Sequence, residues 1–269
     1  MYATIGALVV AALLTCSTEM FAGSDWPESK PDVHEIIAKS VEALKRDWEE
    51  APKYECFERD RLKDGTKVYK DLMIDGSPYE MLVEVNGKPV SGEQEADEKR
   101  KLQETIAKRK AESPEEREQR IQKYELESQR DHELIDQLTQ AFDFRLEGEQ
   151  KLNGFDVYVL KATRRKGYKP TNTQAQVLTG MEGTLWIAKE NYQWVKAEAH
   201  VIHPVTIYGF LAQVKPGTRF ELIKMPVSDG VWLRQHFSMR AHDDILWVFS
   251  QHRFDEITYY GCKVQAQKF

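Results

Sequence analysis

The amino-acid sequence predicts an α+β protein dominated by one large, curved antiparallel sheet of about ten strands, with an amphipathic helix ahead of it. Three observations support this class. A helical repeat of apolar residues occurs near the N-terminus, turn dipeptides recur at regular spacing after it, and no alternation of strands and helices suggests a parallel sheet. The 269 residues can bury the core of one domain, which we place at residues 24–269.

Residues 1–23 are predicted to be a signal peptide. Ala3 to Leu14 form an apolar run of suitable length, and the more polar stretch after it contains small residues suited to cleavage. The segment Leu13-Leu14-Thr15-Cys16 resembles the lipobox of bacterial lipoproteins, in which the cysteine is acylated. The alternative is that Cys16 is discarded with an ordinary signal peptide. Either way we expect export, to the periplasm or the outer membrane.

The first element of the mature chain is an amphipathic helix. Apolar residues recur at helical spacing between charged ones, and Pro52 marks the end of the pattern. One face of this helix should pack on the sheet. The residues that carry the pattern are Val33, Ile36, Ile37, Val41, Leu44 and Trp48.

A meander of antiparallel strands follows. The dipeptides Asp64-Gly65, Asp75-Gly76 and Asn86-Gly87 are eleven residues apart and favour the positive φ angles of tight hairpin turns. Strand-forming residues fill the intervals. Strand signals resume at Phe142 and continue nearly to the C-terminus, with further turns at Asn153-Gly154 and Asp229-Gly230.

Residues from about 91 to 140 are predicted to be an inserted, highly charged helical hairpin. Ser91 with Gln94 and Ser113 with Glu116 both fit the capping-box pattern, which places a break between two helices near Ser113. Few large apolar residues occur in either helix. The hairpin is therefore either a solvated surface element or an arm that recruits a protein partner.

The sequence offers little support for catalysis or for nucleic-acid binding. The net charge is −6, whereas phosphate backbones require clustered Lys and Arg. Neither a nucleophile elbow nor a phosphate-binding loop occurs, and no cofactor is predicted. No apolar run reaches the ~20 residues needed to span a bilayer. A metal-dependent hydrolase that uses the late histidines is a further alternative, although their spacing fits no zinc pattern: His200, His203, His236, His242 and His252.

Removal of residues 1–23 would leave two cysteines, Cys56 and Cys262. In an oxidising compartment such a pair can form a disulfide, here joining the two ends of the domain. Two buried free thiols are the alternative.

Aromatic residues are concentrated on the later strands. Most of them should fill the core, but as a set they could line an apolar cavity. The candidates for ligand contact are Trp186, Tyr192, Trp194, Phe210, Phe220, Trp232 and Phe237.

One strand pair resembles a known family. The strand Gly183 to Ile187, a turn through Lys189, and the strand Tyr192 to Lys196 together resemble the LolA-like family of outer-membrane lipoprotein-sorting proteins, whose relatives include LolB-like and RseB-like proteins. The resemblance implies an unclosed β-barrel wrapped around a helix, with an apolar interior that accepts lipids or lipoprotein acyl chains. The charged insertion departs from the basic family pattern.

These features favour a non-catalytic envelope protein that binds lipids or lipoprotein acyl chains in a hydrophobic cavity. Some members of the resembled family sense a protein partner instead, so the alternative is an envelope sensor or scaffold that acts through the charged hairpin.

Overall fold

The computed structural model describes residues 31–62, 64–207, 212–228, 230–240 and 256–266. The predicted signal peptide with Cys16 lies outside the described residues, as do Phe210, His242 and His252.

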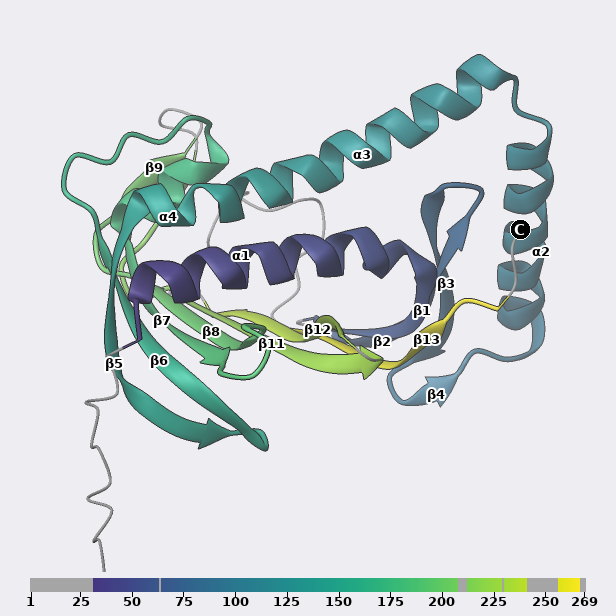
Figure 1. The fold of residues 1–269 in the computed structure, drawn as a ribbon. Coiled ribbons are helices and arrows are strands. Elements are labelled where there is room, and N and C mark those ends of the chain that lie inside the picture. The colour runs from purple at the N-terminus through teal and green to yellow at the C-terminus, as the bar shows by residue number, and fades with distance from the viewer. Residues whose placement is uncertain (1–30, 63, 208–211, 229, 241–255, 267–269) are drawn as a thin grey trace, which may run out of the picture. The chain divides into compact units, whose positions relative to one another are not determined.

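One antiparallel sheet of eleven strands dominates the described chain, in the order β4-β3-β2-β1-β13-β12-β11-β8-β7-β6-β5 (Figure 1). A separate two-stranded ribbon pairs β9 with β10. The strands are β1 (Tyr54–Leu62), β2 (Gly65–Ile74), β3 (Ser77–Val85), β4 (Lys88–Pro89), β5 (Phe142–Leu152), β6 (Phe155–Arg164), β7 (Met181–Ala188), β8 (Trp194–Val201), β9 (Val205–Ile207), β10 (Ala212–Val214), β11 (Arg219–Ser228), β12 (Val231–Arg240) and β13 (Glu256–Val264).

Two meanders, β1 to β4 and β5 to β8, form the two ends of this sheet, and β11 to β13 join them in the middle. The edge strands β4 and β5 are different strands at opposite ends, so the sheet is not closed. The α+β class is confirmed, and an unclosed sheet against a helix is the architecture that the LolA-like resemblance implies.

Three of the predicted hairpin turns form where the dipeptides stand; at the first dipeptide, Gly65 is instead the first residue of β2 and pairs with Leu62, and Asp229 of the last lies outside the described residues. Asp75, Asn86 and Asn153 have φ angles of 46°, 50° and 51°, and the glycine after each also has a positive φ. Two successive positive φ angles match the right-handed twist of the flanking strands. The local sequence therefore determines where β2, β3 and β5 end.

Helix α1 (Val33–Glu50) lies against the sheet and continues into a 3-10 turn, Ala51–Lys53, that contains Pro52. The side chain of Asp32 caps its N-terminus by accepting a hydrogen bond from the His34 N–H at 2.9 Å. Its buried face carries both apolar and polar residues: Ile36, Ile37, Ser40, Ala43, Leu44 and Asp47.

The insertion consists of α2 (Gly92–Lys110), α3 (Pro114–Asp136) and the short α4 (Leu138–Ala141). The capping box predicted at Ser113 and Glu116 is present. The one predicted at Ser91 is not: Ser91 is the N-cap of α2, but its side chain makes no capping hydrogen bond. The residue after it, Gly92, has a φ of 60°.

Arginines of the insertion hold it against the β2–β3 hairpin. Arg109 donates to the carbonyl oxygens of Ile74, Ser77 and Pro78 at 2.6 to 3.0 Å. Arg120 donates to the carbonyl oxygen of Asp75 and the hydroxyl of Ser77. The turn between β2 and β3 is thus bound by both inserted helices.

Helix α3 then runs back over α1 (Figure 1). The rings of Trp48 and His132 stack at 3.8 Å between centroids, and Lys45 pairs with Asp136 at 2.8 Å. The C-terminal half of α3 therefore packs on α1.

The side of the sheet that faces α1 holds one apolar core. Leu160, Leu185, Ile187 and Trp194 of three strands pack against Ile36, Ile37 and Leu44 of the helix. A second apolar cluster lies around the 3-10 segment Gln174–Gly180 and the β9–β10 ribbon.

A disulfide links Cys56 on β1 to Cys262 on β13, two residues 206 positions apart in the sequence. It lies where a bulge interrupts the register between Glu55 and Phe57. The bond thus joins the first and last strands of the described chain.

Candidate functional site

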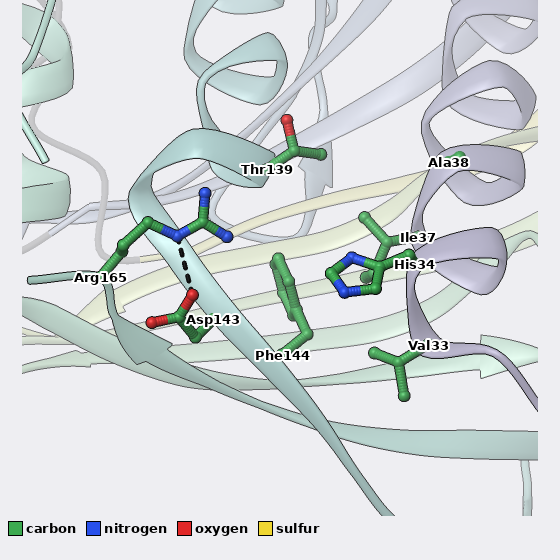
Figure 2. A pocket seen from close by; sticks show the side chains of 8 residues that line it. All are labelled: Val33, His34, Ile37, Ala38, Thr139, Asp143, Phe144 and Arg165. Carbon is green, nitrogen blue, oxygen red and sulfur yellow. Dashed lines mark hydrogen bonds and ion pairs between the residues drawn. The ribbon is translucent and has the colours of Figure 1, made fainter.

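A surface pocket of about 340 Å³ opens between the first two turns of α1, helix α4 and edge strand β5 (Figure 2). Its volume is at the small end of the range for ligand pockets in proteins. The lining residues are Val33, His34, Ile37, Ala38, Thr139, Asp143, Phe144 and Arg165.

The apolar wall of the pocket comes from local sequence patterns. Val33 and Ile37 are four residues apart on α1 and share one face of the helix. Phe144 lies opposite them on β5 and packs against the same core cluster as Val33. The pocket is therefore continuous with the apolar packing between α1 and the sheet.

The polar rim is built around Arg165, which follows β6. Its Nε donates to Oδ1 of Asp143 at 2.7 Å, and its Nη2 donates to the carbonyl oxygen of Phe142 at 3.0 Å. The backbone N–H of Arg165 donates to the carbonyl oxygen of Ala141 at 2.7 Å. These contacts fix the guanidinium between the edge strand and α4.

A pocket of this kind can hold an apolar chain with a polar end. The wall offers aliphatic and aromatic carbon, and the rim offers hydrogen-bond donors. Its lining includes a single carboxyl group, that of Asp143, which is paired with Arg165.

Six of the aromatic residues predicted to contact ligand are described by the structure, and none of these six lines this pocket. Trp194 is buried under α1, where its Nε1–H donates to the hydroxyl of Ser40 at 3.1 Å, and Tyr192 packs against the same cluster. Trp186 and Trp232 belong to a separate cluster with Val157 and Val195.

Phe220 and Phe237 occupy β11 and β12. Phe220 packs against the cluster around Gln174–Gly180, and it also lines a second hollow, of about 370 Å³. That hollow carries both signs of charge on β8, β11 and β12, including Glu198, Arg219 and Arg240. Phe237 pairs with Leu222 and Ile257 in register.

Sequence patterns could have indicated only part of the pocket. The helical repeat includes Val33 and Ile37, and Phe144 stands in a predicted strand. Nothing in the sequence places Arg165 or Thr139 beside them, because that proximity depends on how β5, β6 and α4 pack.

A cluster of acidic and tyrosine side chains shares one face of β1, β2, β3 and β13. Glu58 is in register with Tyr69 and Tyr259, and Asp71 with Glu80. Asp60 lies two residues after Glu58, on the same face of β1, and is in register with Ile257 of β13. Ile257 pairs with Phe237 of β12, and Phe237 pairs with Leu222 of β11, which packs on the α1 core. The cluster therefore lies on the helix-facing side of the sheet.

Burial, with the charge of Glu58 as the next cause, raises the pKa of Asp60 to about 7 and that of Asp71 to about 8. One carboxyl oxygen of each is buried without a hydrogen-bond partner.

Stability should therefore fall as the pH rises. Between the ordinary pKa of aspartic acid and these raised values, the folded state binds more protons than the unfolded state, so the free energy of unfolding decreases with pH. We expect a loss of a few kcal/mol between roughly pH 5 and pH 8, measured by urea unfolding, because solvent screening keeps it below the roughly 7 kcal/mol that unscreened shifts would give.

Asp71→Asn mimics the protonated side chain and should flatten this pH dependence. Asp64→Asn, at an exposed turn residue, is the matched control and should leave the slope unchanged. A wild-type stability that stays constant or rises over this pH range would contradict the assignment.

No group of three or more potential metal ligands occurs among the described residues. His200 instead contacts Glu182 at 2.9 Å, and His203 lies beyond the end of β8 at Val201. Within the same residues, none of the helices is both long enough and apolar enough to cross a bilayer.

No protein-family model matches the chain, and no curated protein matches it by sequence. Among solved structures, a DUF1329 family protein from Desulfovibrio piger matches with a TM-score of 0.34 and 12% identity, covering 87% of this chain and 93% of that one. A putative outer membrane lipoprotein-sorting protein domain from Vibrio parahaemolyticus matches with a TM-score of 0.34 and 14% identity, over 86% and 94%.

A LolA superfamily protein from Nitrosomonas europaea matches with a TM-score of 0.33 and 12% identity, covering 87% of this chain and 94% of that one. The matches thus include proteins of the family that the sequence resembles.

Proposed function

We propose that this protein is a non-catalytic binding protein of the bacterial envelope that holds an acyl chain of a lipid or lipoprotein in the pocket between α1, α4 and β5. The observation that carries the proposal is the apolar wall of Val33, Ile37 and Phe144 in a pocket of about 340 Å³. The predicted signal peptide supports a periplasmic or outer-membrane location.

The energetics suit such a ligand. Each buried methylene contributes about 0.8 kcal/mol, so roughly eight methylenes against the wall contribute about 6 kcal/mol before the costs of association. Binding of this kind requires no catalytic group. The pocket lies beside β5, the edge strand at one end of the sheet.

Filling the pocket tests the proposal. Ala38 is an exposed residue of α1 that lines the pocket, so Ala38→Trp should occupy the space without disturbing the core. We expect it to weaken the binding of a fluorescent acyl probe about tenfold or more, measured by titration of the full chain.

Ala107→Trp is the matched control, because Ala107 is an exposed alanine on α2. It should leave probe binding unchanged. Native mass spectrometry of protein exported with its own leader should also show a lipid adduct. Equal binding by the wild type and Ala38→Trp would refute this pocket as the acyl site.

A partner-binding role through the inserted helices is the second candidate, and one observation favours it. The side chain of Leu126 on α3 is 58% exposed, so it offers apolar surface to a partner. Leu126→Lys should then reduce cross-linking to an envelope partner in cells. Deleting the insertion is a poor test, because α3 packs against α1 through Trp48 and His132.

A further inference from the structure

We infer that the pocket prefers a lipid with a free carboxylate end, with Arg165, Thr139 and His34 donating hydrogen bonds to the headgroup. The inference rests on the proposed acyl-binding function and goes beyond it by naming the ligand class. The predicted ligand is a fatty acid whose chain lies against the apolar wall.

Three polar groups face the pocket with unused hydrogen-bonding capacity. The hydroxyl of Thr139 and the imidazole of His34 make no hydrogen bond to any described residue. The guanidinium of Arg165 uses Nε and Nη2 for Asp143 and Phe142, which leaves Nη1 without a partner in the described chain. Figure 2 shows these three side chains around one space, above the ring of Phe144.

These three groups can donate hydrogen bonds, so the matching part of a ligand is a hydrogen-bond acceptor. A guanidinium can only donate, and a charge-assisted hydrogen bond from it to a carboxylate is stronger than one to a neutral oxygen. In Figure 2 the guanidinium lies between Asp143 and Thr139, so Asp143 neutralises Arg165 from one side while the other side remains open to ligand.

The pocket also borders the first turn of α1 at Val33 and His34, where the carboxylate of Asp32 already caps the partial positive charge of the helix end. The wall and the rim together match an acid group followed by a hydrocarbon chain.

The test compares a saturated fatty acid with the alcohol and the amine of the same chain length, each displacing a fluorescent acyl probe from the full chain. We expect the acid to bind about tenfold more tightly than the alcohol at neutral pH, with the amine weakest. Arg165→Gln should weaken acid binding about tenfold and so remove its advantage over the alcohol.

Lys166→Gln is the matched control, because Lys166 is the next residue, is exposed and carries the same charge. It should retain the preference for acid. Thr139→Val removes an exposed hydroxyl that supports no described contact, and it should weaken acid binding about threefold.

The possible failures are distinct. Acid and alcohol binding with equal affinity would overturn the carboxylate preference and leave the acyl site intact. An Arg165→Gln variant that loses both ligands equally would also overturn it, because Arg165 would then only support β5. Failure of every chain to bind would refute the proposed function itself.

Discussion

Replacing Asp47 with alanine should lower the free energy of unfolding by about 4 kcal/mol. Asp47 is 2% exposed on the face of α1 that meets the sheet. Its carboxylate accepts hydrogen bonds from Gln193 Nε2 at 3.1 Å and from the backbone N–H of Trp232 at 3.0 Å, and it pairs with Lys224. The variant leaves all three donors buried without a partner.

Lys224 explains the size of the effect. It is 5% exposed, and burial lowers the pKa of its ammonium while Asp47 opposes that shift. An isolated buried ammonium is costly, whereas removing both charges costs less. Asp47→Ala combined with Lys224→Met should therefore be more stable than Asp47→Ala alone, as measured by urea unfolding.

Glu35→Ala is the control for this experiment. Glu35 pairs with Lys39 on the same helix, but both side chains are exposed. The loss of that pair should change stability by less than about 0.5 kcal/mol. A comparable loss from Glu35→Ala and Asp47→Ala would mean that the buried pair contributes no more than a surface pair.

Removing the disulfide should destabilise the protein by a similar amount, about 4 kcal/mol. The bond between Cys56 and Cys262 closes a loop of more than two hundred residues, so its loss frees a large part of the unfolded chain. The double variant Cys56→Ser with Cys262→Ser should show a lower urea midpoint than the oxidised protein.

The reducing agent dithiothreitol provides the control. It should lower the midpoint of the wild type toward that of the double variant and leave the double variant itself unchanged. Two free thiols in wild-type protein purified without a reducing agent, titrated under denaturing conditions, would contradict the bond.

Local signals determined much of this fold. The turn at Asn86-Gly87 can be predicted because those residues adopt positive φ angles at little cost, and the start of α3 because Ser113 and Glu116 cap each other. The periodicity of α1 likewise requires only neighbouring residues. In each case the physical cause acts within a few positions of the chain.

Tertiary structure alone decided the order of the strands and the position of the pocket. Nothing near β1 in the sequence indicates that it pairs with β13, which follows it by about two hundred residues. Such pairings depend on packing across the whole sheet. The same packing buries Asp47 beside Lys224 and brings Arg165 to α1, so the buried ion pair and the candidate site both follow from contacts between distant segments.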